Sequence, residues 1–263
     1  MKKIKANLLF LGSGGSTGVP MVGCGCAVCT SIDPHNQRLR PSVLLTIGEK
    51  KLLVDTGPDF RLQALSNNIK HLDGVLLTHT HFDHIAGLDE LRTFYLLKRQ
   101  ILPLLVSQTT LNEIKKRYDY LFQKQSNTKS LAAQLDFHVL DGKRGHTRFL
   151  DIPIQYMTYR QGGTEVSGFR WGDIAYIPDI KEYDESIFDD LKDLRVLIVS
   201  ALRYTPSPVH FSVDEAIAFA TKVGAKQSYF MHIAHELDHA PTNASLPAGI
   251  ALAFDGLSLD FEI

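Results

Sequence analysis

The chain has 263 residues, enough for one large domain with a sizeable buried core. Hydrophobic residues make up 44% of the chain and charged residues 22%, both ordinary values for a globular protein. The formal net charge is -1, which excludes a global electrostatic field that would attract nucleic acid or an anionic membrane.

The basic N-terminus, MKKIKANLLFLGSGG, carries a short apolar run before its glycines. This run is too short for a secretory signal or a membrane-spanning helix, so we expect a cytoplasmic protein with no membrane partner.

The three cysteines all fall within Cys24–Cys29. An odd number without a distant partner argues against a disulfide framework.

Apolar runs that end in glycine, aspartate or polar clusters predict strands, and periodic apolar positions predict helices. In the first half of the chain we expect strands at 5–11, 42–47, 51–55, 73–78 and 102–106, helices at 85–98 and 108–122, and a polar loop at 123–131.

Strand signals return in the second half from about residue 135. They include a hairpin in GFRWGDIAYI, turning at Gly172-Asp173, and strands at 194–200 and 227–231. Ser212 and Glu215 form a capping box for a helix that ends near Gly224. No linker interrupts this pattern, which predicts one α/β domain over residues 1–263, built as a sandwich of two sheets with flanking helices.

The segment THTHFDH places three histidines and an aspartate directly after an apolar run. His79 and His81 project to the same side of an extended chain, and Asp83 and His84 follow in the turn that leads into the next helix. Imidazoles with a carboxylate suit zinc, manganese or iron. The alternative, a solvated loop that happens to be rich in histidine, is disfavoured by the tight spacing.

THTHFDH resembles the HxHxDH signature of the metallo-β-lactamase superfamily, hydrolases with an αββα sandwich and a one- or two-metal site between the sheets. LGSGGSTGVPMVGCGCAVC and MHIAHELDH are similar to segments of its PhnP-like branch, which contains a cyclic-phosphate phosphodiesterase. The resemblance covers nearly the whole chain.

The resemblance implies a set of metal ligands and a role for one of them. A water held between two such cations would lose its proton near neutral pH and become the nucleophile, and Asp83 would orient it. The implied ligands are His79 and His81 for the first metal, Asp83, His84 and His232 for the second, and Asp179 as the bridge.

Cys24, Cys26 and Cys29 have the spacing of thiolate ligands for a closed tetrahedral zinc, but they supply only three of four positions. Three small buried hydrophobic residues are the alternative. In the resembling branch the fourth ligand of a structural zinc is the histidine three residues after the last active-site ligand, which is His235 here.

His210 precedes the capped helix, and a helix N-terminus suits a phosphate. In the resembling branch a histidine at this place contacts the phosphate and can protonate the leaving oxygen; a neutral loop histidine is the alternative.

One departure from the resembling branch concerns the third ligand of the first metal, which in that branch is normally a histidine followed by glycine. This place reads YRQGG, with Gln161 as a poorer ligand, so the first metal is weakly held or the site is mononuclear. Only a shifted loop would let His146 replace it.

We therefore expect a metal-dependent phosphodiesterase that acts on a small or cyclic phosphate ester. It would use one or two zinc, manganese or iron ions and one structural zinc. A tRNA 3′-processing nuclease is an alternative, but that family carries an inserted basic arm, and the candidate insertion here is residues 108–131. A non-catalytic metal-binding protein is a second alternative, favoured by Gln161. The natural substrate, the native metal and the oligomeric state stay open, with a homodimer as one alternative.

Overall fold

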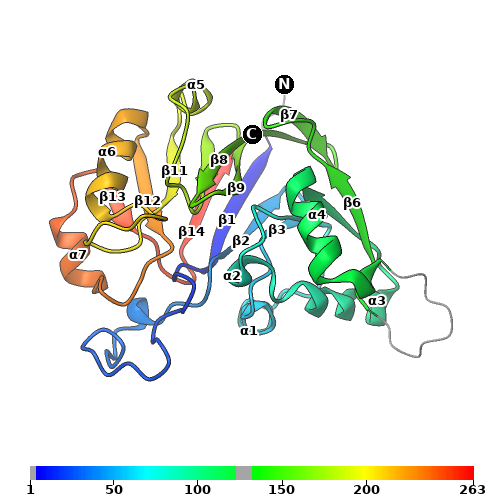
Figure 1. Cartoon of the computed structure of the whole chain (residues 1–263), viewed down its shortest axis with the longest axis horizontal. Coiled ribbons are helices and arrows are strands. Elements are labelled where there is room, and N and C mark those ends of the chain that lie inside the picture. The colour runs from blue at the N-terminus through cyan, green and yellow to red at the C-terminus, as the bar shows by residue number, and fades with distance from the viewer. Residues whose placement is uncertain (1–3, 123–131) are drawn as a thin grey trace.

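Two seven-stranded sheets face each other in the structure, a computed structural model that describes residues 4–122 and 132–263 (Figure 1). The predicted loop at 123–131 lies outside the described residues. The first sheet has the order β14-β1-β2-β3-β4-β5-β6. Its strands are β1 (Lys5–Gly12), β2 (Ser42–Ile47), β3 (Lys50–Val54), β4 (Gly74–Leu76), β5 (Leu102–Val106), β6 (Leu135–Val139) and β14 (Ser258–Glu262).

The second sheet has the order β13-β12-β11-β10-β9-β8-β7. Strands β10 to β13 run parallel to one another, whereas β7, β8 and β9 form an antiparallel meander. The strands are β7 (Arg144–Phe149), β8 (Ile152–Gln161), β9 (Thr164–Trp171), β10 (Ile174–Ile177), β11 (Val196–Ser200), β12 (Gln227–Met231) and β13 (Ile250–Leu252).

Helices cover the outer face of each sheet (Figure 1). Against the first sheet lie α1 (Phe60–Ser66), α2 (Phe82–Ile85), α3 (Arg92–Lys98) and α4 (Gln108–Arg117), and against the second α5 (Ile187–Asp190), α6 (Val213–Val223) and α7 (His239–Ser245). Three 3-10 helices complete the described elements: η1 (Pro34–Asn36), η2 (Leu88–Leu91) and η3 (Asp119–Leu121).

Alternating residues of the strands build separate apolar layers. On β1, Leu8 and Phe10 enter the core between the two sheets, whereas Leu9 and Leu11 pack on the side of α1 and α3. A third layer lies between the second sheet and α6. Because side chains alternate along a strand, each sheet can be covered on both faces. The predicted αββα sandwich is confirmed.

The predicted helix over 85–98 is broken in the structure, because the chain at Gly87 lies too close to a neighbouring loop. A Cβ at Gly87 would approach the carbonyl oxygen of Gly57 to 2.2 Å, and the Gly87 N–H donates to the carbonyl of Thr56. The chain therefore forms α2, η2 and α3 in succession. The helix expected over 108–122 ends earlier, at Arg117.

The predicted capping box of α6 is confirmed. The hydroxyl of Ser212 accepts the N–H of Glu215, and the Glu215 carboxylate accepts the N–H of Ser212. The helix ends before Gly224, whose φ of 69° suits glycine.

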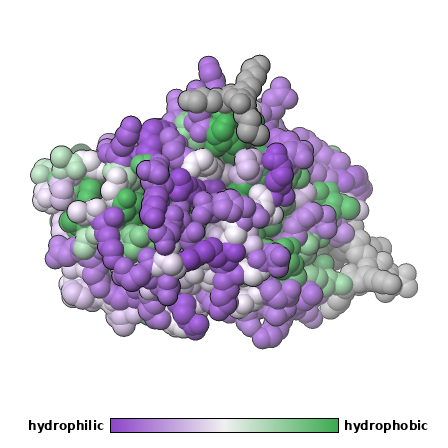
Figure 2. All heavy atoms as spheres, turned by 90° about the horizontal axis from the view of Figure 1, so that it is seen from above, coloured by the Kyte–Doolittle hydropathy of each residue, from purple (hydrophilic) through white to green (hydrophobic). Residues whose placement is uncertain are grey.

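On the face seen in Figure 2, hydrophilic side chains dominate and apolar ones form small separate patches. Within residues 4–122 and 132–263, no helix combines the length and the apolar character needed to cross a membrane.

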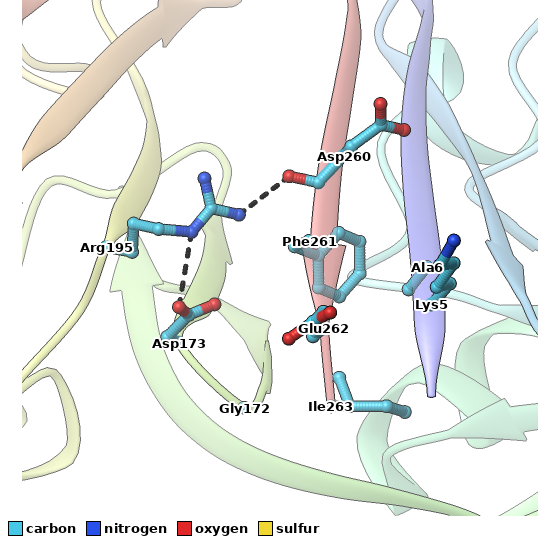
Figure 3. Close-up of a pocket in the computed structure, with 9 residues that line it drawn as sticks. All are labelled: Lys5, Ala6, Gly172, Asp173, Arg195, Asp260, Phe261, Glu262 and Ile263. Carbon is cyan, nitrogen blue, oxygen red and sulfur yellow. Dashed lines mark hydrogen bonds and ion pairs between the residues drawn. The ribbon is translucent and has the colours of Figure 1, made fainter. Parts of the chain in front are cut away.

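A hollow of about 800 Å³ lies at the end of β10 that is remote from Asp179. Its Arg195 donates to the carboxylate of Asp173 at 3.2 Å and to the carbonyl oxygen of Asp260 at 2.8 Å (Figure 3). The predicted histidine cluster is not part of its lining. Asp179 and His232 follow the opposite ends of β10 and β12.

Candidate active site

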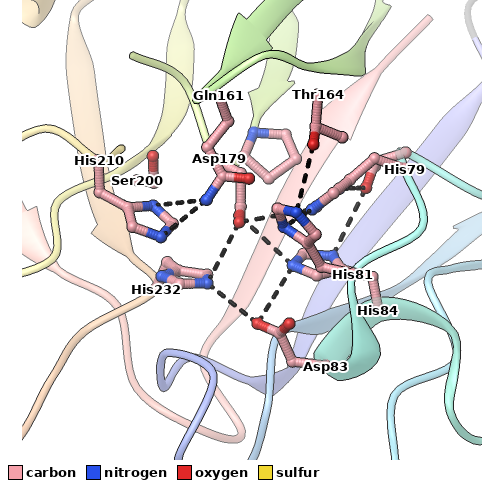
Figure 4. A network of polar contacts seen from close by, with 12 residues as sticks. His79, His81, Asp83, His84, Gln161, Thr164, Asp179, Ser200, His210 and His232 are labelled. Atoms are coloured by element: carbon pink, nitrogen blue, oxygen red, sulfur yellow. Dashed lines mark hydrogen bonds and ion pairs between the residues drawn. The ribbon is translucent and has the colours of Figure 1, made fainter. Parts of the chain in front are cut away.

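The candidate site lies where strands of both sheets end (Figure 4). The HTHFDH segment follows β4, Asp179 follows β10, and His232 directly follows β12. Asp179 and His232 have positive φ angles of 49° and 59°, which are uncommon outside glycine. Such backbone strain concentrates at functional sites. Both side chains point toward the HTHFDH segment (Figure 4).

The first ligand group contains His79, His81 and Asp179, whose donor atoms lie within 4.8 Å of one another. Nε2 of His79 is 3.0 Å from Nδ1 of His81 and 3.7 Å from Oδ2 of Asp179. Two nitrogens bound to one tetrahedral zinc are about 3.3 Å apart, given Zn–N bonds of about 2.0–2.1 Å. The spacing therefore matches a shared cation.

The second ligand group contains Asp83, His84, Asp179 and His232, all buried. Nε2 of His84 lies 3.5 Å from Asp83 and 3.4 Å from Asp179. Nε2 of His232 lies 3.2 Å and 3.3 Å from the same two carboxylates. Asp179 belongs to both groups, as expected for a bridging aspartate. The structure thus brings together all six of the predicted histidine and aspartate ligands.

Unpaired buried atoms test whether these residues fit a metal. Nε2 of His84 and Oδ1 of Asp179 are buried without a hydrogen-bond partner among the described residues. Such atoms are costly and rare in folded proteins. A cation between them would satisfy both, and a set of imidazoles and carboxylates fits zinc, manganese or iron. The residues present therefore fit a divalent metal.

Carboxylates and imidazoles of the site shift one another's pKa values. Burial opposes ionisation of Asp83 and Asp179, but the imidazoles of His84 and His232 hold the pKa of both carboxyls well below the usual range. Burial also opposes the charged form of His84 and His232, yet the carboxylates outweigh it and raise the pKa of both rings. Burial lowers the pKa of His79, and the nearby carboxylates of Asp179 and Asp83 do not outweigh this effect as they do at His84 and His232. The lowered pKa values of Asp83 and Asp179 mean that both carboxylates are ionised at neutral pH.

Asp55 is a site residue that the sequence analysis missed. Its Oδ2 accepts a hydrogen bond from Nδ1 of His84 at 2.7 Å, and the Thr78 N–H and hydroxyl donate to the same carboxylate at 2.8 Å. This contact leaves Nε2 of His84 free for a metal. One signal was present in the sequence, because a charged residue directly follows the apolar run of β3. In the structure this residue adopts a positive φ of 64°.

Gln161 and His210 form a buried pair beside the ligands (Figure 4). The Gln161 side-chain amide donates to Nε2 of His210 at 2.8 Å, and the His210 ring stacks on His232 with a centroid distance of 4.5 Å. Burial and the neighbouring His232 lower the pKa of His210 to about 4. Oε1 of Gln161 has no hydrogen-bond partner in the described part of the chain. Its role as a metal ligand stays a prediction.

His146 does not replace the missing ligand, so that alternative is wrong. His146 is exposed on β7 and pairs with Gln155 of β8. Six positions of extended strand separate Gln155 from Gln161, which corresponds to about 20 Å at roughly 3.3 Å per residue.

The predicted structural zinc ligands also lie together. Sγ of Cys24 and Sγ of Cys26 lie 3.3 Å and 3.4 Å from Nδ1 of His235, and Cys29 completes a group of four donor atoms within 4.8 Å of one another. The Cys29 N–H and His235 lower the pKa of Cys26 to about 6, which favours the thiolate that zinc binds. This group therefore fits a tetrahedral zinc.

The glycine-rich loop that precedes the cysteines is tied to the segment that follows His232. The Gly15 N–H donates to the carbonyl of Ile233, and the Ile233 N–H donates to the carbonyl of Ser13. Ile233 lies directly after His232 and two residues before His235. A zinc on the cysteine loop would therefore restrain the segment that carries an active-site ligand.

Proteins that are similar to this chain differ in name. In Porphyromonas gingivalis, a protein named octanoyltransferase is 36% identical over 255 residues, which cover 95% of this chain and 50% of that protein. The chain thus spans half the length of this relative. The zinc-bound PqqB structure from Methylobacterium extorquens is 20% identical, covers 97% of this chain and 100% of its own, and has a TM-score of 0.78. At this identity it supports the fold alone.

A crystal structure described as a new diphosphatase from the PhnP family is 39% identical to this chain, with a TM-score of 0.91. The match covers 100% of this chain and 99% of that one. The family described as Beta-lactamase superfamily domain matches residues 50–233, which include both ligand groups. The chain therefore belongs to the metallo-β-lactamase superfamily and to its PhnP-like branch.

Proposed function

We propose that the chain hydrolyses a phosphodiester bond in a small or cyclic phosphate ester. The observation that carries the proposal is the convergence of two ligand groups on a shared Asp179, with His210 stacked on His232 beside them. This arrangement offers cation sites and a hydrogen-bond donor to one phosphoryl group. The similarity to a protein described as a PhnP-family diphosphatase supports hydrolysis at a phosphoryl group.

The ligands would be His79, His81 and Asp179, with Gln161 as a weaker candidate, for the first ion, and Asp83, His84, Asp179 and His232 for the second. A divalent ion in such a site acts as a Lewis acid on phosphoryl oxygens and makes water a better nucleophile at neutral pH. Zinc and manganese are our proposed ions. We further propose that Cys24, Cys26, Cys29 and His235 hold a structural zinc.

Asp83 and His210 would act on the substrate and the attacking water. Because the pKa of Asp83 is lowered, its carboxylate is ionised at neutral pH and can orient a water by accepting a hydrogen bond from it. His210 has a pKa of about 4 in the free protein and is therefore neutral. Its ring N–H can donate to a phosphate oxygen, and the negative charge of a bound phosphate would raise its pKa toward the value needed to protonate the leaving oxygen.

A phosphoric anhydride is the second candidate substrate, because the 39% identical neighbour is described as a diphosphatase. A phosphodiester and an esterified diphosphate such as ADP-ribose both present a phosphorus atom with two bridging oxygens, so one site can serve either. A tRNA 3′-processing activity and a non-catalytic metal-binding role remain alternatives. We expect a cytoplasmic enzyme with a small-molecule substrate.

The test is a substrate screen on purified protein loaded with zinc or manganese. Bis(p-nitrophenyl) phosphate, cyclic nucleotides, a ribose cyclic phosphate, ADP-ribose as a diphosphate and a tRNA precursor would be compared. We expect turnover of the small diesters, which Asp83→Ala abolishes while the circular dichroism spectrum is unchanged. Wild-type turnover by Asp83→Ala would refute the role of Asp83. Full metal content without hydrolysis of any substrate would favour the non-catalytic alternative.

A further inference from the structure

Asp179, the aspartate shared by the two ligand groups, lies in a turn with a strained backbone. Its φ of 49° falls in the left-handed region, which residues other than glycine adopt at a cost. Such a conformation persists only where the surrounding structure holds it. Within residues 4–122 and 132–263, the recorded polar contacts of the carboxylate itself are all with histidines of the two ligand groups. The backbone around Asp179 therefore has to fix the direction of the carboxylate.

Two side chains hold the peptide groups on either side of Asp179. The hydroxyl of Tyr159, on β8, donates to the carbonyl oxygen of Pro178, the residue before Asp179. The hydroxyl oxygen of Ser200, the last residue of β11, accepts the N–H of Ile180, the residue after Asp179, at 3.2 Å (Figure 4). Both side chains are buried. The turn is thus held from two different strands.

These two hydrogen bonds act on the two backbone dihedral angles of Asp179. Rotation about φ turns the peptide group that contains the Pro178 carbonyl, and rotation about ψ turns the peptide group that contains the Ile180 N–H. Relaxation out of the left-handed region has to turn at least one of these peptide groups. A hydrogen bond on each peptide group therefore opposes relaxation and keeps the Asp179 side chain pointing at the ligand groups.

The ring of Tyr159 reaches this turn because Gly168 leaves room for it. Strand β9 lies between β8 and β10 in the sheet, and Gly168 is on β9. A Cβ at Gly168 would approach Cε1 of Tyr159 to 2.9 Å and Cδ1 of Ile177 to 2.8 Å. Burial and the nearby Asp179 raise the pKa of Tyr159 well above its ordinary value. The phenol is therefore protonated at neutral pH and remains a hydrogen-bond donor.

We propose that Tyr159 and Ser200 are positioning residues that hold Asp179 in the orientation in which one carboxylate serves both metal sites. Loss of either hydroxyl would let the turn relax and would withdraw the shared ligand from both ligand groups at once. Loss of the contact between Asp55 and His84 would instead affect the second group alone. The inference rests on the metal sites of the proposed function and is independent of the substrate.

Tyr159→Phe and Ser200→Ala each remove one hydroxyl and test the inference in the full chain. Manganese is titrated into chelator-treated protein by calorimetry, because carboxylates and imidazoles accept manganese whereas cysteine thiolates favour zinc. Each variant should weaken both binding steps by roughly 10–100-fold, the range for an outer hydrogen-bond partner of a metal ligand. Tyr156→Phe is the matched control, because Tyr156 is also buried on β8 and its hydroxyl also donates to a backbone carbonyl, that of Asp141.

The control separates positioning from stability. Tyr156→Phe and Tyr159→Phe lose the same kind of hydrogen bond and should show similar falls in thermal unfolding temperature, but Tyr156→Phe should bind manganese like the wild type. Affinities in Tyr159→Phe and Ser200→Ala equal to those of the control, or a weakening of one binding step alone, would overturn the inference. A single binding step in the wild type would also overturn it. If the wild type hydrolyses no phosphoric ester, the proposed function fails, and the manganese affinities alone decide the inference.

Discussion

The side-chain amide of Gln161 donates to Nε2 of His210 across 2.8 Å, and both residues are buried beside His232. With Nε2 engaged as an acceptor, the proton of the neutral imidazole resides on Nδ1. Gln161 therefore acts on His210, the residue to which we assign the contact with the phosphate.

His210→Ala should lower turnover by roughly 10²–10⁴-fold while metal content stays unchanged, the range for loss of a general acid. The comparison of steady-state kinetics with elemental analysis of the same preparations checks both parts. His138→Ala, at an exposed histidine of β6, is the control and should retain full activity. Loss of metal together with activity would identify His210 as a ligand instead.

Asp55→Asn should weaken metal binding at the second ligand group by roughly 10–100-fold, because it removes the charge that orients His84. A competition titration with a chromogenic chelator measures the affinity. Asp136→Asn is the matched control, since Asp136 also pairs with a histidine, but at an exposed position 3.0 Å from His138. Equal affinity in Asp55→Asn and wild type would contradict the orienting role.

Cys26→Ser should release one zinc per chain and lower the thermal unfolding temperature, because a structural zinc contributes directly to the free energy of folding. Activity should also fall, since His235 and His232 lie on one short segment. Elemental analysis and thermal denaturation, with and without added zinc, are the measurements. An unchanged zinc count would exclude the structural site.

The part of the site that was predictable from the sequence is the part encoded by short spacing. His79, His81, Asp83 and His84 lie within six positions, so one turn of chain brings them together. The strand pattern was likewise predictable, because alternation along each strand is local.

The features that were missed depend on contacts between distant segments. Asp55 becomes a site residue only because β3 and β4 are neighbours, which places it beside His84. The break of the helix at Gly87 results from the close approach of Gly57. Tyr159 and Ser200 hold the turn at Asp179 together although β8 and β11 are far apart in the chain. Periodicity within a segment carries no information about such contacts.

Metal binding at the two ligand groups should depend differently on pH. The carboxylates raise the pKa of His84 and His232, so a metal at the second group has to displace protons, and its affinity should rise with pH by up to about tenfold per unit for each proton displaced. Burial lowers the pKa of His79 and His81, so the first group should be nearly independent of pH above about 7.

Calorimetry in buffers with different ionisation enthalpies counts the protons released at each step. Release of protons at neutral pH should accompany binding to the second group alone. Two binding steps with the same pH dependence would contradict this assignment.

Gln161→His should strengthen metal binding at the first ligand group. If residue 161 faces the first ion, an imidazole there adds a better ligand to His79, His81 and Asp179, raises affinity at the first group and moves occupancy toward two metals. Stronger binding of the first ion should also shift the activity profile to lower pH, since a more firmly held cation favours deprotonation of the attacking water.

Titration of metal into metal-free protein compares Gln161→His with the wild type, and Gln161→Leu separates the two roles of the residue. The leucine variant loses the hydrogen bond to His210 and should lose turnover without gaining metal. If Gln161→His and wild type give identical binding curves while Gln161→Leu loses activity, residue 161 acts only through His210. The first ion would then be held by three protein ligands and water, a coordination that tetrahedral zinc accepts in catalytic sites.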